Sequence, residues 1–441
     1  MDISTLQQFR HDVYLCFRRA KDALFDMVDA LLTETQARSF PELSLSPFFQ
    51  RKWHSLYEAL EDGKIDTQNL QKTFIKYLPA PREGKRLVLG VDVTGIERPF
   101  SSTLRDRTAM PMHNIPHAVP KKSTAITFGL RYSTVTVLPE EPSSSTFILD
   151  QRRVSSGKTD IEVAFEQLRE IVSQLPYRPL ILFDRGYVAL WLWCKLSGLA
   201  CDALGRLKSN QAFYKPAPPR TGKQGQPRKD GEKLKLNDNS TQKNPDGTWN
   251  GNDAKGHPVQ ISWWNKMHAE KARWLELTII QVIRPQAVGS ERDPRISWFA
   301  YIGQDPEEGF AQVALLYGLR FGQENGYRFD KQALLWTEPR LRTPEQFDRW
   351  THIVTIVHNL VVLSRDLIEG ELRPWENKQR TQTPQQVRRG LAKYLPELGT
   401  PASPPKPRGK SKGRSCGTLV NKAKRFPVVR KTGKAPRPVP T

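Results

Sequence analysis

The chain of 441 residues has few cysteines and no long apolar segment. Its four cysteines are too widely spaced for a disulfide framework or for a zinc site built from paired cysteines and histidines. Any bound metal should therefore be a hard cation with oxygen ligands. No stretch approaches the roughly 18 apolar residues of a membrane span, and Met1–Thr5 lacks the features of a signal peptide. We expect a cytoplasmic protein without a membrane partner.

Acidic residues are scarce relative to basic ones. The chain has 46 Asp and Glu against 68 Lys and Arg, which gives a net charge of +22. A surplus of this size favours a polyanion as partner, because Lys and Arg neutralise phosphates and release counterions. We therefore expect a nucleic-acid partner and a nucleoid-associated location. A ribosome-associated or merely soluble basic protein is the alternative that composition leaves open.

The order of apolar patterns predicts a mixed α/β sheet that follows an N-terminal helical segment. Residues 1–82 show apolar spacings of three and four, which are typical of helices. From 83 to 214 come short β-branched runs at 87–94, 124–138 and 179–183, with an amphipathic helix between the last two. Strands first, and then alternating strand and helix, indicate a mixed sheet.

The second half of the chain divides by composition. Residues 215–295 begin with a polar stretch and continue with strand-like runs, which indicates an insertion. Residues 296–370 contain one more strand and two helical stretches. Residues 371–441 are rich in Pro, Lys and Arg, and from 401 onward they hold twelve basic residues and no acidic one. This last segment is predicted to be a disordered tail attracted to DNA.

Two aspartates follow or end buried strands. Asp92 lies in the run 87–94, and Asp184 comes directly after the run 179–183. A carboxylate at a strand end is held rigidly at the edge of the sheet, where ligands of α/β proteins collect. Two such residues on neighbouring strands could bind hard cations together. Strand-terminal aspartates also often cap the next turn, and these two residues alone do not decide between the roles.

Four functional side chains share one stripe of a predicted helix. Tyr317, Arg320, Glu324 and Lys331 have offsets of 0, 3, 7 and 14, which place them on one face if the helix continues past Gly326. A phenol, a guanidinium, a carboxylate and an ammonium make a poor apolar core. They suit a surface that contacts a metal and a phosphate backbone together.

These motifs resemble the DDE transposases of bacterial insertion sequences. One branch of that family carries Tyr-x2-Arg-x3-Glu-x6-Lys around its third acidic residue, and residues 317–331 match all four positions. The triplet 92–94 (Asp-Val-Thr) and the segment 184–187 (Asp-Arg-Gly-Tyr) also resemble members of the branch. The resemblance spans roughly residues 85–370 and includes the long interval between Asp184 and Glu324. It covers neither the N-terminal helices nor the basic tail.

The resemblance implies a ribonuclease H-like catalytic core, formed by 83–214 and 296–370. For 1–82, the pattern of helix, short turn and helix is compatible with a DNA-reading module, and we expect this segment to bind the DNA ends. It implies that Asp92, Asp184 and Glu324 are catalytic ligands of two Mg²⁺ or Mn²⁺ ions, and that nearby side chains bind DNA phosphates. Two such ions neutralise both the attacking and the leaving oxygen of an in-line displacement. Water would attack first, and the freed 3′-hydroxyl would then attack target DNA. The phosphate-binding residues so implied are Tyr317, Arg320 and Lys331.

The implied activity is cut-and-paste transposition of an insertion sequence. Its partners would be the double-stranded terminal inverted repeats, the target DNA and a second copy of the chain in a synaptic homodimer. Two alternatives remain open. One is a nuclease of the same fold that does not transfer strands, and the other is a transposon-derived DNA-binding protein without catalysis. Terminal inverted repeats that border the gene would favour the mobile element.

Two further residues could have a role in the site. Asp106 is a rival carboxylate, but its polar surroundings favour a loop with ion pairs. Trp298 lies on a predicted strand shortly before the Tyr317 helix and could stack on a flipped base. Because no motif ties Trp298 to that role, packing in the core is the favoured interpretation.

Overall fold

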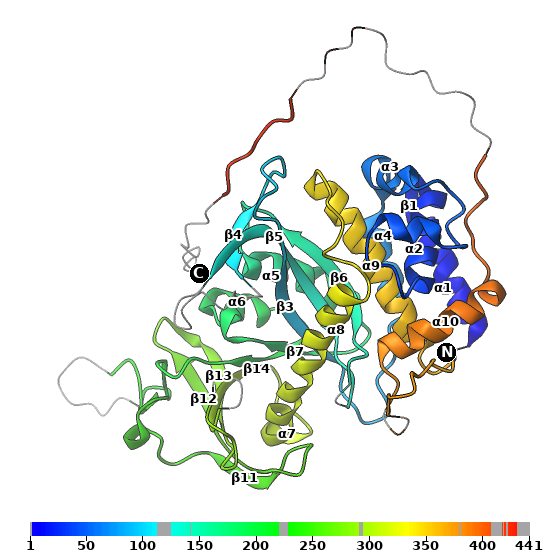
Figure 1. Cartoon of the computed structure of the whole chain (residues 1–441). Coiled ribbons are helices and arrows are strands. Elements are labelled where there is room, and N and C mark those ends of the chain that lie inside the picture. The colour runs from blue at the N-terminus through cyan, green and yellow to red at the C-terminus, as the bar shows by residue number, and fades with distance from the viewer. Residues whose placement is uncertain are drawn as a thin grey trace.

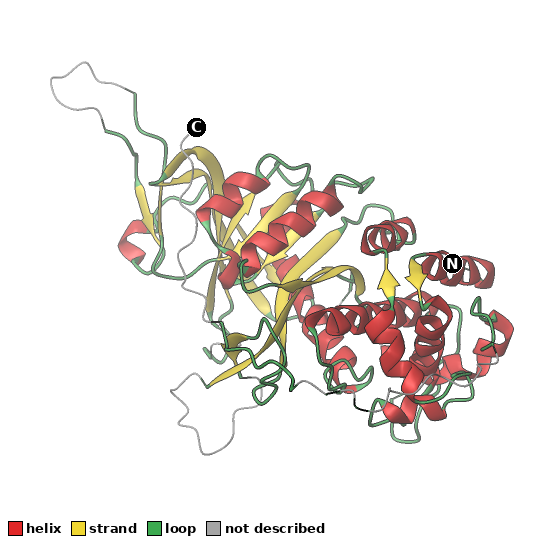
Figure 2. Cartoon of the chain, turned by 90° about the horizontal axis from the view of Figure 1, so that it is seen from above, coloured by secondary structure: helices red, strands yellow, loops and turns green. Residues whose placement is uncertain are grey.

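The computed structural model of the chain describes residues 2–112, 125–141, 143–219, 228–290, 294–377, 379, 381–406, 417, 419 and 422–429. Within these residues a twelve-stranded mixed sheet carries helices on both faces, and a group of helices lies beside one end of the sheet (Figures 1 and 2). The predicted mixed α/β architecture is confirmed.

Five strands form the centre of the sheet. They are β3 (Val88–Glu97), β5 (Ile126–Val137), β6 (Phe147–Val154), β7 (Leu180–Phe183) and β8 (Asp202–Arg206). Their order is β6-β5-β3-β7-β8, in which β5 is antiparallel to both neighbours and β3, β7 and β8 are parallel. This arrangement is consistent with the ribonuclease H-like core that the resemblance implies.

One face of the central sheet is covered by α5 (Asp160–Val172) and α6 (Leu190–Leu196). The helix α5 begins with a capping box in which Thr159 and Glu162 satisfy each other's backbone N–H groups. Below these helices the inward side chains of β3 and β7 are fully buried. Burial on both faces explains why these strands are near-continuous apolar runs.

Beyond β8 the sheet continues through β14 (Ile296–Ile302), β13 (Ala272–Ile283) and β12 (Pro258–Ala269), all antiparallel. Short strands border this extension: β9 (Ala212–Tyr214), β10 (Lys233–Lys235) and β11 (Gly247–Asn252). The segment 215–295 thus extends the same sheet, and the division into core and insertion stays a prediction. The remaining strand, β4 (Thr108–Pro111), pairs with the first residues of β5.

A helical segment covers the opposite face of the sheet. It consists of α7 (Gly309–Leu316), the 3-10 turn η4 (Tyr317–Arg320) and α8 (Phe321–Gln332). The α7 helix packs on β12 and β13, and α8 passes over β3 (Figure 1). The three pieces follow one another directly, and Gly326 does not interrupt α8. A side chain at Gly326 would meet Thr146 Oγ1 at 2.8 Å, so glycine lets the helix pack closely there.

The N-terminal helices share their hydrophobic core with the C-terminal ones. Helix α2 (Lys21–Thr33) packs against both α9 (Pro344–Ser364) and α10 (Pro384–Leu398), and α3 (His54–Asp62) also contacts α9. A single buried cluster runs from Leu6 to Ala402 and includes one face of the sheet. The other N-terminal elements are α1 (Ile3–Leu15), β1 (Phe17–Arg19), η1 (Pro41–Leu45), β2 (Lys64–Ile65) and α4 (Thr67–Lys76).

The disordered tail was predicted to begin at residue 371, but helix α10 lies within 371–441. The sequence of α10 is rich in arginine and glutamine, and it also contains an apolar stripe at helical spacing, formed by buried Val387, Leu391 and Leu395. Arg388 is also buried and donates hydrogen bonds to the carbonyls of Leu31, Glu34 and Ala333. The prediction of disorder is therefore wrong for residues 384–398.

Two segments near the C-terminus contact the rest of the protein. The Ser403 N–H donates to Asp22 in α2. Farther on, the N–H groups of Phe426 and Val429 donate to the carbonyls of Ser102 and Arg107, beside β4. In the part of the chain that the structure describes, we find no helix with the length and apolar character of a membrane span.

Candidate active site

The alternation of side chains along β3 and β7 places Asp92 and Asp184 on the same face of the sheet. Val91 pairs with Phe183 in the parallel ladder, so each aspartate directly follows a paired residue. Because side chains alternate between faces, Asp92 points away from the face that buries Val91. Asp184 likewise points away from the face that buries Phe183. Both carboxylates therefore face the α7–α8 segment.

Glycine allows α8 to approach β3 next to Asp92. A Cβ atom on Gly90 would lie 2.6 Å from the side-chain oxygen of Gln323. The Gln323 amide is buried and donates to Thr134 O and Thr136 Oγ1, both at 3.3 Å. These bonds fix α8 against β3 and β5, and they lie one residue from Glu324.

Arg320 lies between the two aspartates. Its Nη2 is 3.5 Å from Asp92 Oδ2, and its Nη1 is 3.7 Å from Asp184 Oδ1. Tyr317 completes the group, because its hydroxyl donates to Asp184 Oδ1 at 3.4 Å and accepts from Arg320 Nη1 at 3.2 Å. Residues that are distant in sequence thus meet around one guanidinium.

The electrostatics of the site reflect this arrangement. Burial raises the pKa of Asp92; Arg320 opposes that change, and the charges of Asp184 and Glu324 add to it. Burial alone would lower the pKa of Arg320, but Tyr317, Asp92 and Asp184 together raise it. The guanidinium is therefore permanently charged and is the main compensation for two neighbouring carboxylates.

Glu324 lies in the first turn of α8, one turn beyond Arg320, and its side chain is exposed. Its charge reaches Asp92, as the raised pKa of Asp92 indicates. Even so, among the described residues no group of three or more Asp, Glu, His or Cys side chains converges closely enough to hold a metal ion. In this arrangement the guanidinium of Arg320 lies between Asp92 and Asp184.

Lys331 contacts the same strand farther along. Its Nζ donates to Thr94 Oγ1 at 2.7 Å, two residues beyond Asp92 on the same face of β3. Burial lowers the pKa of Lys331, and the charges of Glu97, Asp330 and Asp92 oppose that change. Tyr317, Arg320 and Lys331 of the predicted stripe thus all turn toward β3 and β7.

Two tyrosines near Asp92 were not among the predicted site residues. The Tyr327 hydroxyl donates to the backbone carbonyl of Asp92 at 3.1 Å. Tyr187 is buried, and its hydroxyl has no hydrogen-bond partner among the described residues. Burial, followed by the charge of Asp92, raises the pKa of both phenols well above the usual value. Tyr327 is seven residues from Arg320, a helical spacing that could have indicated a shared face.

The two rival residues do not join this group. The Asp106 carboxylate pairs with Arg153 and accepts from the Ser156 N–H at 2.9 Å, so it is engaged in a loop. Trp298 is 4% exposed, and its ring lies 5.6 Å from that of Trp264. A base could not stack on it without opening the core, which supports the packing interpretation.

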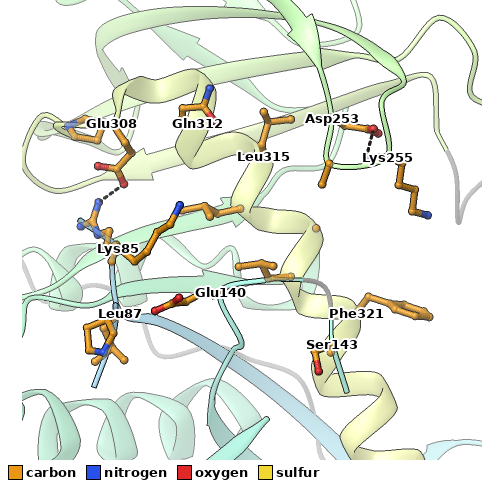
Figure 3. A pocket seen from close by; sticks show the side chains of 18 of the residues that line it. Lys85, Leu87, Glu140, Ser143, Asp253, Lys255, Glu308, Gln312, Leu315 and Phe321 are labelled. Carbon is orange, nitrogen blue, oxygen red and sulfur yellow. Dashed lines mark hydrogen bonds and ion pairs between the residues drawn. The ribbon is translucent and has the colours of Figure 1, made fainter. Parts of the chain in front are cut away.

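A large hollow of about 2250 Å³ lies at the opposite ends of the central strands. Figure 3 shows Glu308, Gln312 and Leu315 in a row, with Asp253 and Lys255 of the β11–β12 turn beside them and Lys85 and Glu140 on the opposite side. The lining contains none of the predicted catalytic or phosphate-binding residues. It also mixes acidic and basic side chains, which does not favour a polyanion.

Comparison with known proteins places these residues in a family. A family model described as a DDE superfamily endonuclease matches residues 12–270, which include Asp92 and Asp184 and end before Glu324. No curated protein matches the sequence. Among solved structures, the chain is similar to a piggyBac transposase synaptic complex with hairpin DNA, at 10% identity and a TM-score of 0.39. That match covers 88% of this chain and 76% of the other. Because the family model spans more than half of the sequence, the chain belongs to the DDE superfamily endonucleases.

Proposed function

We propose that this protein is a DNA transposase that cuts and joins DNA strands with two divalent metal ions. One observation carries the proposal: Asp92 and Asp184, on adjacent parallel strands, face a single cationic group beneath the helical segment that bears Glu324. Family membership supports nuclease activity and implies a general dependence on divalent metal. Transposition within the Tyr-Arg-Glu-Lys branch is the more specific part of the proposal.

The residues present suit a hard divalent cation. Asp92, Asp184 and Glu324 offer only carboxylate oxygens, which are the ligands that Mg²⁺ prefers. The two aspartates already lie close to one positive charge, so their positions tolerate a cation between them. Glu324 is exposed in the first turn of α8, and its charge acts on Asp92. We propose these three residues as the ligands of Mg²⁺ or Mn²⁺.

The bound ions would neutralise charge on the attacking and leaving oxygens of an in-line displacement. The protein's own side chains would position the DNA. Tyr317, Arg320 and Lys331 present a hydroxyl, a guanidinium and an ammonium on the face that borders the carboxylates. Such groups bind phosphate oxygens, and the planar guanidinium can do so with two parallel hydrogen bonds. We assign these three residues to phosphate binding and not to proton transfer.

The proposed partners are double-stranded terminal inverted repeats and target DNA, bound by a homodimer. The net charge of +22 supports a polyanionic partner. We propose that residues 1–82 bind the DNA ends. Because these helices share a core with α9 and α10, they would act as part of the main body and not as a tethered module.

Cleavage of DNA that carries the repeats flanking the gene tests this proposal. We expect Asp92→Asn, Asp184→Asn and Glu324→Gln each to abolish Mg²⁺-dependent cleavage and to leave DNA binding largely intact. Glu307→Gln is the matched control, since Glu307 is an exposed carboxylate of the distant hollow. Full activity in any one of the three variants would remove that residue from the site.

The products distinguish the proposal from its alternatives. Cleaved ends joined to a second DNA molecule are expected of a transposase. Cleavage without joining would instead support a nuclease of the same family. Binding without cleavage in Mg²⁺ and in Mn²⁺ would support a DNA-binding protein that has lost catalysis.

A further inference from the structure

The contacts of Arg320 to the two carboxylates are longer than those of a typical structural ion pair. Its two contacts to Asp92 and Asp184 are 3.5 and 3.7 Å long. Charge-assisted hydrogen bonds between guanidinium and carboxylate are typically about 2.7–2.9 Å. The Arg320 Nε is also buried without a hydrogen-bond partner among the described residues. The guanidinium is thus held by charge more than by directed hydrogen bonds.

Arg178, two residues before β7, shows the geometry of a fixed ion pair. Arg178 donates from Nε and Nη2 to Asp202 Oδ1 at 2.9 and 2.7 Å, and also to the carbonyl of Cys201. Asp202 is only 2% exposed and also accepts from the Gln304 N–H. Asp184, in contrast, has a side chain that is 48% exposed. The Arg320 contacts are therefore longer than those of Arg178, and its carboxylate partners are more exposed, although the Arg320 side chain itself is 13% exposed against 33% for Arg178.

We propose that Arg320 is an exchangeable resident cation, which holds Asp92 and Asp184 together when no metal is bound and competes with divalent ions for them. This inference rests on the proposed metal site. Without a positive charge, the carboxylates of Asp92 and Asp184 would repel each other and destabilise the pairing of β3 and β7. Arg320 supplies that charge from the protein itself, so the folded site does not depend on metal.

The competition links metal binding to DNA binding. A divalent ion that binds both carboxylates neutralises their charge and so weakens the electrostatic attraction between them and Arg320. The guanidinium then becomes available to a phosphate, the ligand we assign to it above. Since coupling between two ligands is reciprocal at equilibrium, phosphate held by Arg320 would in turn favour metal binding.

Titration of the purified full chain with Mn²⁺ tests the exchange directly. We expect Arg320→Ala to bind Mn²⁺ about five- to tenfold more tightly than the unchanged protein, at the low end of usual coupling between sites. Arg320→Lys keeps the charge and should stay close to the unchanged affinity. Arg328→Ala is the matched control, because Arg328 is an exposed arginine of the same helix. It should leave the affinity unchanged.

Thermal unfolding supplies a readout that does not depend on activity. In metal-free buffer Arg320→Ala should unfold at a lower temperature than the unchanged protein, because two carboxylates have lost their counter-charge. Saturating Mn²⁺ should narrow this difference. A lower unfolding temperature in both buffers, together with unchanged Mn²⁺ affinity, would identify a structural ion pair and overturn the proposal.

Mn²⁺ binding by the Asp92→Asn variant tests the proposed metal site independently of the exchange with Arg320. If Asp92→Asn weakens Mn²⁺ binding while Arg320→Ala leaves it unchanged, the metal site stands and the exchange is wrong. If Mn²⁺ binds equally well to the Asp92→Asn variant, the proposed metal site is itself wrong, and the exchange with it.

Discussion

Asp92 and Asp184 owe their shared environment to residue alternation, which the sequence could predict. Each aspartate ends or follows a buried run, and the period of two along a strand decides which face it occupies. The sequence could not predict that Arg320 lies between them, because this requires the order of strands in the sheet and the path of α8 above it. Nor could it predict the buried hydroxyl of Tyr187, which depends on how α6 packs.

The two tyrosines near Asp92 should respond differently to loss of their hydroxyl groups. Tyr327→Phe removes the hydrogen bond to the Asp92 carbonyl and should cost about 1 kcal/mol of unfolding free energy. Tyr187→Phe removes a buried hydroxyl without a partner among the described residues and should be neutral or stabilising. Urea unfolding of the two variants measures both effects. Equal destabilisation would show that Tyr187 also has a partner in solution.

At the scale of elements, a buried ion pair holds α8 in place. Asp330 of α8 contacts His358 Nδ1 at 2.6 Å, and the Thr146 carbonyl contacts Nε2 at 2.7 Å. An ionised carboxylate and a carbonyl are both hydrogen-bond acceptors, so the doubly protonated ring satisfies both. Burial alone would lower the pKa of His358, but Asp330 and Thr146 raise it. The pair joins α8, α9 and the start of β6 beneath the site.

This pair predicts a loss of stability at alkaline pH. A histidine whose pKa is raised by folding contributes stability below its unfolded pKa of about 6.5 and loses it as the pH passes the folded value. Unfolding free energy should therefore fall above neutral pH, and His358→Gln should lack this fall. His352→Gln is the control on the same helix, since burial lowers the pKa of His352 to about 4. An alkaline profile unaltered by His358→Gln would contradict the assignment.

The prediction of elements was most accurate where apolar periodicity was strong and least accurate where polar composition masked it. The strands β3 and β7 and the capped helix α5 follow directly from their patterns. Helix α10 was missed because arginine and glutamine surround its apolar stripe. Buried Arg388 shows the reason: its charge is satisfied by carbonyls of α2 and of residues that only the tertiary fold brings near.

At the scale of the whole molecule, positive charge is concentrated toward the C-terminus. Twelve basic residues follow position 401, and eleven of them lie in residues 407–441. Truncation after Lys406 should weaken DNA binding and flatten its dependence on salt, because fewer counterions are released. The unfolding temperature should change little, since in 422–429 only Phe426 and Val428 are even half-buried. An unchanged salt slope would show that the tail does not contact DNA.

We propose that three carboxylates, distant in sequence, bind divalent metal together. The test is anomalous diffraction from crystals of the full chain grown with Mn²⁺ and flanking-repeat DNA. We expect manganese peaks within about 2.0–2.3 Å of oxygens from Asp92, Asp184 and Glu324, with Arg320 turned toward phosphate. Manganese elsewhere, or no manganese with Arg320 still between the two aspartates, would contradict this proposal.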